Sequence, residues 1–178
     1  FYYGRSDLMK KSAIPNTFTL GNLAFGLLSI LMTFHGNFKL AAIFVLLAAL
    51  ADRYDGRIAR LLNVDSEIGK ELDSLADLVS FGVAPSILIY RLYNFMSFGF
   101  VGYLLVLVFP ICGAYRLARY NISTFDGVFT GVPITLAGSF MAVFALFTVN
   151  RPLNPALPVI FIVSLSYLMI SKFQLKKV

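Results

Sequence analysis

Long apolar stretches alternate with short polar breaks along the whole chain. A helix needs about 20 residues to cross the hydrocarbon core of a bilayer, and six stretches approach or exceed that length. The breaks contain Gly, Asn and Pro, as in His35-Gly36-Asn37 and Asn150-Arg151-Pro152, which is typical of turns. We therefore predict an all-α integral membrane protein built as a six-transmembrane-helix bundle. The predicted spans are residues 17–35, 39–61, 70–95, 98–120, 132–149 and 155–172.

The segment before the first span is polar to basic. Residues 1–13 read FYYGRSDLMKKSA, a pattern that fits either a short interfacial helix with Tyr2, Tyr3 and Leu8 dipping into lipid or an irregular chain end. We treat 1–13 as a juxtamembrane segment and 14–178 as one six-helix domain.

Composition agrees with a bilayer as the natural solvent. The 178 residues are 58% hydrophobic and only 13% charged, whereas soluble domains are about 25% charged. The net charge of +6 does not indicate nucleic acid, because the basic residues lie at the ends of apolar stretches, where they attract lipid headgroups. The single cysteine, Cys112, excludes an intramolecular disulfide, and we expect it to pack inertly.

The basic residues also predict the orientation in the membrane. With an inside N-terminus, 12 of the 15 Lys and Arg residues fall on the cytoplasmic side and three outside, which puts both termini in the cytoplasm. The outside set is Lys39, Arg91 and Arg151. The inside set is Arg5, Lys10, Lys11, Arg53, Arg57, Arg60, Lys70, Arg116, Arg119, Lys172, Lys176 and Lys177. We predict a multi-pass protein of the cell membrane.

Acidic residues are concentrated in one short region. Seven of the nine Asp and Glu residues lie between Asp52 and Asp77, and five of them fall inside predicted spans, where ionisable groups are costly and usually functional. Asp52 and Asp55 are three residues apart, and Asp73 and Asp77 are four apart, so each pair shares one helix face. Two antiparallel helices can thus present two carboxylate pairs to each other.

Four close carboxylates repel one another unless divalent cations lie between them. Ligation by oxygen alone suits hard ions, so we expect two Mg²⁺ or Mn²⁺ ions and a phosphate-bearing substrate. The alternative is that these aspartates form structural salt bridges with Arg53, Arg57 and Arg60.

Small and basic residues accompany the carboxylates. Gly56 and Ala59 leave space for a bulky headgroup, Arg60 is placed to clamp a phosphate, and Gly69 admits a flat base. Close helix packing is the alternative for Gly56 and Ala59.

With these aspartates and the small and basic residues between them, the chain resembles the CDP-alcohol phosphatidyltransferase family. Its signature spans 26 residues and agrees at all eight fixed positions: Asp52, Asp55, Gly56, Ala59, Arg60, Gly69, Asp73 and Asp77. The resemblance implies a homodimer of six-helix protomers with the active site near the cytoplasmic interface. It further implies that Asp52, Asp55 and Asp73 bind metal, and that Asp77 binds metal and is also the general base.

Further stretches resemble the phosphatidylserine-forming branch of this family. They are Pro15–Asn22, Glu71–Ser86 and Arg116–Asn121. The implied reaction joins CDP-diacylglycerol and L-serine to give phosphatidylserine and CMP. Serine carries a carboxylate, for which Arg116 and Arg119 are the candidate partners. Anchoring at the cytoplasmic interface is the alternative for both arginines.

Three asparagines are expected to add hydrogen bonds to substrate or nucleotide: Asn16, Asn22 and Asn121. Helix capping is the alternative for Asn16. The lone histidine, His35, falls in an outer loop, so we expect catalysis without histidine.

Other functions stay open from sequence alone. Within the family, the acceptor could be glycerol phosphate or inositol phosphate, and the donor could be an archaeal ether lipid. A divalent-cation transporter would place acids near the bilayer midplane, whereas here they cluster at one end of the spans.

Overall fold

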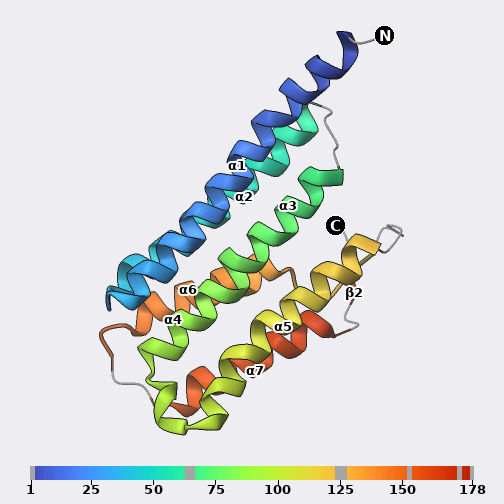
Figure 1. The fold of residues 1–178 in the computed structure, drawn as a ribbon. Coiled ribbons are helices and arrows are strands. Elements are labelled where there is room, and N and C mark those ends of the chain that lie inside the picture. Colours follow the sequence, from blue (N-terminus) through green and yellow to red (C-terminus); the bar gives the residue numbers. More distant parts are fainter. Residues whose placement is uncertain (1–2, 63–66, 123–127, 152–153, 172–173, 177–178) are drawn as a thin grey trace.

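Long helices dominate the fold (Figure 1). A computed structural model describes residues 3–62, 67–122, 128–151, 154–171 and 174–176. In chain order the elements are α1 (Tyr3–Phe34), α2 (Phe38–Leu62), α3 (Glu67–Asp77), a π-helix (Leu78–Val83), α4 (Ala84–Leu92), a 3-10 helix (Phe95–Phe98), α5 (Phe100–Ile122), β1 (Val128–Thr130), α6 (Ile134–Thr148), α7 (Ala156–Ile170) and β2 (Gln174–Lys176).

Five of the six predicted spans agree with observed helices to within three residues at each end, once α3, the π-helix and α4 are taken as one continuous helix. The first span differs, because α1 is a single helix from Tyr3 and the predicted juxtamembrane segment forms its first turns. A separate interfacial helix is therefore not observed. The predicted α-helical class is confirmed, and the three-residue strands β1 and β2 add a small antiparallel ribbon to it.

By length and apolar composition, three of the described helices are sufficient to cross a bilayer. They are Asn16–Phe34 within α1, the continuous helix Glu67–Leu92, and α5. Helices α6 and α7 are apolar but have only 15 residues each, about 23 Å at 1.5 Å per residue, which is less than a hydrocarbon core of about 30 Å. The membrane character is confirmed, whereas the number of spans is not.

The hairpin between α1 and α2 is closed by local turn chemistry. Gly36 has a φ of 76°, a left-handed conformation that glycine adopts without strain. The Asn37 N–H donates to the Met32 carbonyl at 2.9 Å, which ends α1 in a Schellman-type motif. The Asn37 side chain then accepts from the Leu40 N–H at 3.2 Å and caps α2.

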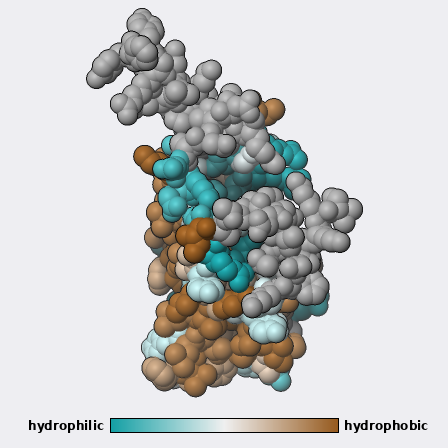
Figure 2. Space-filling model, turned by 90° about the vertical axis from the view of Figure 1, so that its right-hand side faces the viewer, coloured by the Kyte–Doolittle hydropathy of each residue, from teal (hydrophilic) through white to brown (hydrophobic). Residues whose placement is uncertain are grey.

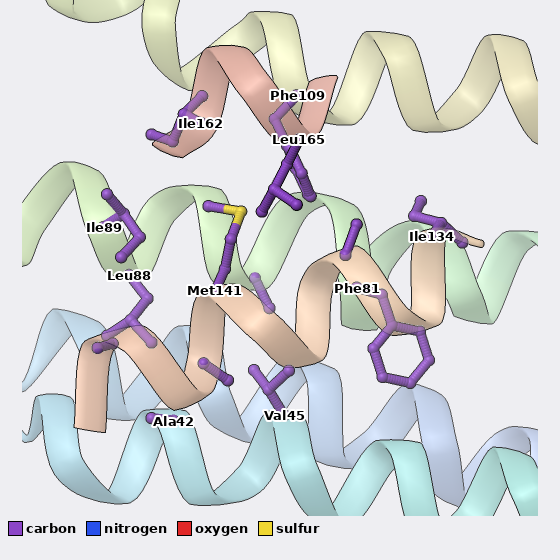
Figure 3. Packing of buried hydrophobic residues seen from close by; sticks show 14 of the residues in the cluster. Ala42, Val45, Phe81, Leu88, Ile89, Phe109, Ile134, Met141, Ile162 and Leu165 are labelled. Atoms are coloured by element: carbon purple, nitrogen blue, oxygen red, sulfur yellow. The ribbon is translucent and has the colours of Figure 1, made fainter. Parts of the chain in front are cut away.

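Helix α6 lies at the centre of the core. It packs against α2, against α4 and against the π-helix, and Figure 3 shows Met141 and Ile134 on α6, with Val45 on the neighbouring α2. The polar surface is segregated. Figure 2 shows hydrophilic residues gathered toward one end of the molecule and hydrophobic residues covering the other. Leu107 and Phe147 are among the large apolar side chains exposed to the surroundings.

One close backbone contact joins α6 to the π-helix. A Cβ added at Gly138 would overlap the carbonyl oxygen of Phe81. Pro85, four residues after Phe81, has no N–H to offer that carbonyl, and the Ala84 N–H instead bonds to Val79, five residues back. Only glycine at this position of α6 allows the two backbones to approach so closely.

Gly138→Ala should therefore destabilise the protein, although alanine is the better helix former. We expect a loss of about 1–3 kcal/mol from overpacking, measured as a lower Tm by circular dichroism in detergent. Gly21→Ala is the matched control, because a Cβ there meets nothing within 4 Å. An unchanged or higher Tm for Gly138→Ala would contradict this account of the contact.

Candidate functional site

Three carboxylates meet where the second half of α2 faces α3. Asp52, Asp73 and Asp77 each offer an oxygen within 4.8 Å of the others. Asp55 lies outside this three-residue group, although its charge reaches Asp73 and Asp77. The prediction that the two aspartate pairs face each other is thus confirmed for Asp52, Asp73 and Asp77, three of the four side chains.

Helix α1 supplies hydrogen-bond donors to the carboxylates that are most buried. The Thr19 hydroxyl donates to Asp55, which is 6% exposed. One turn later, the Asn22 amide nitrogen donates to Asp77 at 3.0 Å, and Asp77 is 8% exposed. Hydrogen bonds to a carboxylate favour its charged form, so α1 helps to keep these acids ionised and fixes their orientation.

Sequence reasoning missed Thr19 and assigned Asn22 to substrate or nucleotide, whereas in the structure its amide bonds to Asp77. The available signal was position: both residues are polar and lie inside an otherwise apolar span, where polar side chains usually find a partner.

A change of helix type begins immediately after Asp77. This residue ends α3, and the π-helix Leu78–Val83 follows. Single π-turns within α-helices occur frequently at functional sites. The Ser80 hydroxyl, on the π-helix, donates to the Asn22 carbonyl at 2.9 Å. The π-helix therefore holds α1 in place, and α1 in turn orients Asp77 through the Asn22 side chain.

The donor set fits a hard divalent cation. Three oxygen ligands of like charge within 4.8 Å repel strongly in a partly buried site, and a cation between them removes that repulsion. Arg53 and Arg57 are exposed, and among the described side chains neither forms an ion pair with these aspartates. The salt-bridge alternative is therefore not supported for these two arginines.

The residues predicted to bind the CDP headgroup lie on α2 and α3, the two helices that carry the carboxylate cluster. A Cβ at Gly56 would meet nothing within 4 Å, so close packing within this chain does not explain that glycine. Gly69 is half-buried on α3. Ala59 and Arg60 belong to α2, and their side chains lie outside the described part of the structure.

The residues predicted to bind the acceptor substrate, serine, lie on α5. Arg116 is 8% exposed and within electrostatic reach of Asp77 and Arg119. A buried position beside a carboxylate argues against simple interfacial anchoring of Arg116. Asn121 instead joins α5 to α3: its amide donates to Ser74 at 3.0 Å and to Glu71 at 3.3 Å.

Two residues had no expected role in the reaction, and the structure gives their positions. Cys112 is buried in α5. His35 is exposed at the end of α1, where Nδ1 donates to the Leu31 carbonyl at 2.7 Å.

An apolar groove lies between α1 and α2. It has a volume of about 360 Å³ and runs between α1 and α2, from Tyr54 and Thr17 past Gly21 to Phe25 and Leu47. Because α1 and α2 are antiparallel (Figure 1), one end of the groove lies at Ala51 and Tyr54 and the other at Phe25 and Leu47. Asp52 and Asp55 do not line it, although they are the chain neighbours of Ala51 and Tyr54.

Fold and site together define a helical membrane protein with a partly buried cluster of aspartates suited to a divalent cation. The family model for CDP-alcohol phosphatidyltransferase matches residues 12–171. The chain therefore belongs to the CDP-alcohol phosphatidyltransferase family, and the predicted resemblance is confirmed.

Individual relatives agree with this assignment. A Bacillus subtilis protein named CDP-diacylglycerol–serine O-phosphatidyltransferase is 41% identical over 90% of this chain and 88% of its own length. A Helicobacter pylori protein of the same name is 44% identical over 69% of this chain and 53% of its own length. An archaetidylserine synthase of Methanothermobacter thermautotrophicus is 37% identical over 93% of this chain and 70% of its own.

The carboxylate geometry predicts that Asp73 is needed for cation binding. Asp73→Asn should weaken Mn²⁺ binding by more than about tenfold, the smallest loss that even an outer-shell ligand partner typically causes. The measurement is titration with Mn²⁺, followed by electron paramagnetic resonance of the free ion. Glu67→Gln is the control, because Glu67 is exposed on the same helix and outside the cluster. Equal affinities of Asp73→Asn and the unmodified protein would contradict the assignment.

Proposed function

We propose that this protein transfers a phosphatidyl group from CDP-diacylglycerol to L-serine, giving phosphatidylserine and CMP. The observation that carries the proposal is the cluster of Asp52, Asp73 and Asp77 within 4.8 Å, in a chain of this family that is 41% identical to a relative named for the same reaction. Family membership gives no support to the cation-transporter alternative.

In the proposed reaction, the serine hydroxyl attacks the phosphorus that carries the lipid. Asp77 accepts the hydroxyl proton as the new P–O bond forms, and the bond to CMP breaks, so that CMP leaves with its electron pair. Asn22 holds the Asp77 carboxylate through its amide nitrogen, so the base is oriented before the substrate arrives. Positioning and electrostatics, with little covalent chemistry by the protein, are expected to dominate.

We propose that Asp52, Asp55, Asp73 and Asp77 hold two divalent cations, Mg²⁺ or Mn²⁺. When bound, such ions neutralise the diphosphate charge and the departing phosphate. The all-oxygen donor set supports hard ions, and the Thr19 hydrogen bond to Asp55 keeps the fourth carboxylate beside the other three.

Substrate contacts follow from the same geometry. We propose that Gly56, Ala59, Arg60 and Gly69 bind the CDP headgroup, and the open space above Gly56 supports this. Arg116 and Arg119 are proposed to bind the serine carboxylate, with Asn121 bracing α5 against α3 beside them.

The assembly is proposed to be a homodimer in the cell membrane. Its protomer would be one domain of residues 14–178 with six spans, preceded by the segment 1–13, and with both termini and the active site on the cytoplasmic side. The excess of cytoplasmic Lys and Arg supports this orientation. Helices α6 and α7 would span as short helices, which a locally thinned bilayer accommodates.

The groove between α1 and α2 is proposed to hold one acyl chain of the donor. Its lining is mostly apolar, and one end lies at Ala51 and Tyr54, which are next to Asp52 and Asp55 in the chain. A lipid whose headgroup lies at Asp52 can therefore place one acyl chain along α1 without passing through the protein core.

Purified protein should release CMP from CDP-diacylglycerol only when L-serine is added, in a panel that also contains glycerol phosphate and inositol phosphate. Asp77→Asn should lower kcat by at least about a hundredfold, because a general base contributes about 10²–10⁴-fold. Consumption of glycerol phosphate in place of serine would overturn the acceptor, and preference for an ether-linked donor would overturn the diacyl assignment. Normal turnover by Asp77→Asn would overturn the base.

Filling the groove should weaken binding of long-chain donors selectively. Gly21→Phe should raise the KM for long-chain CDP-diacylglycerol about tenfold, because displacing about two CH₂ groups costs about 1.6 kcal/mol. The KM for a short-chain donor should change little. Leu27→Phe is the control, because Leu27 is exposed on the same helix and does not line the groove. Equal changes for both donors would contradict the placement of the acyl chain.

A further inference from the structure

Two buried polar atoms lack a hydrogen-bond partner among the described residues: one belongs to a residue bonded to Asp77, and the other to a residue within electrostatic reach of Asp77. They are Oδ1 of Asn22 and Nε of Arg116. Asn22 is fully buried and Arg116 is 8% exposed. An unpaired buried polar group costs about 1–3 kcal/mol, so a site that keeps two of them needs a reason.

The orientation of the Asn22 amide follows from its neighbours. Asp77 has a carboxylate that only accepts, so the nitrogen of Asn22 must face it, and that bond measures 3.0 Å. Oδ1 is consequently turned away from Asp77 and is available as an acceptor. The backbone at this point is also held, because Ser80 donates to the Asn22 carbonyl and Gly26 packs directly onto Ser80.

The two unpaired atoms have opposite hydrogen-bonding character. Asn22 offers a neutral acceptor from α1, and Arg116 offers a cationic donor from α5, whose charge acts on Asp77. An α-amino acid carries an ammonium donor and a carboxylate acceptor on one carbon, next to the carbon that bears the hydroxyl in serine. A phosphate dianion has no donor for the Asn22 oxygen, and a phosphorylated alcohol could offer it only a neutral hydroxyl, whereas the ammonium of a zwitterion offers a charged donor. The pair therefore matches a zwitterion better than a phosphorylated alcohol.

We propose that Asn22 Oδ1 accepts a hydrogen bond from the ammonium group of the acceptor amino acid, while Arg116 Nε–H donates to its carboxylate. The two contacts direct the hydroxyl toward Asp77. Asn22 therefore has two tasks at once: its nitrogen positions the base and its oxygen recognises the ammonium. This inference rests on the proposed use of serine and adds a specificity residue from α1 that contacts the acceptor directly.

The test compares acceptors that differ by one charged group. L-serine is compared with 3-hydroxypropanoate, which lacks the ammonium, and with ethanolamine, which lacks the carboxylate, each as acceptor or as competitive inhibitor of serine. In Asn22→Leu, the preference for serine over 3-hydroxypropanoate should fall about ten- to hundred-fold, the loss expected for a hydrogen bond to a charged group. In Arg116→Gln, the preference for serine over ethanolamine should fall by a similar factor.

Ser29→Ala is the matched control. Ser29 is the other fully buried side chain on α1 with an unpaired oxygen, and it lies seven residues beyond Asn22, so both preferences should be unchanged. Binding of CDP-diacylglycerol by each variant reports on folding, and Asn22→Ser replaces Asn22→Leu if the latter fails to bind.

The outcomes separate the two proposals. If Asn22→Leu lowers activity with serine and 3-hydroxypropanoate by the same factor, Asn22 only positions Asp77 and this inference is overturned while the proposed function stands. If the unmodified protein does not use serine at all, the proposed function itself fails.

Discussion

Mutual repulsion among buried carboxylates is the constraint on which the rest of this structure depends. Three aspartates bring oxygens within 4.8 Å of one another at a site where burial weakens solvent screening. Such a cluster holds together only when the surrounding helices are fixed and a cation balances the charge. The donors on α1, Thr19 and Asn22, meet part of this demand by bonding Asp55 and Asp77.

The helices around the carboxylates are held in place by close contacts between their backbones, which small residues permit. Gly26 lets α1 lie directly on Ser80, and Gly138 lets α6 lie on the Phe81 carbonyl. Both contacts are made to the π-helix that follows Asp77. The segment that carries the expected base is therefore held from two sides, so the position of Asp77 depends on glycine contacts one turn beyond it.

Polarity is arranged along the length of the bundle. Hydrophilic residues gather toward one end (Figure 2), and the groove between α1 and α2 runs from Tyr54 to Phe25 along a mostly apolar surface. A lipid headgroup and its chains need opposite environments within one binding site. A membrane bundle with its charges at one end provides both, and the same division explains why a reaction at a phosphate can be carried out by a chain that is 58% hydrophobic.

The sequence alone determined the helix positions, the membrane character and the family. Apolar length and polar breaks are local properties, so five of six spans agree to within three residues, and the aspartate spacing is a property of two short segments. Only the tertiary structure decided that Asp55 lies outside the three-carboxylate group, that α1 is continuous from Tyr3, and that α6 forms the centre of the core. It alone paired Asn22 with Asp77, 55 residues away. Such pairings depend on how whole helix surfaces fit together, and periodicity along the chain carries no information about which surfaces meet.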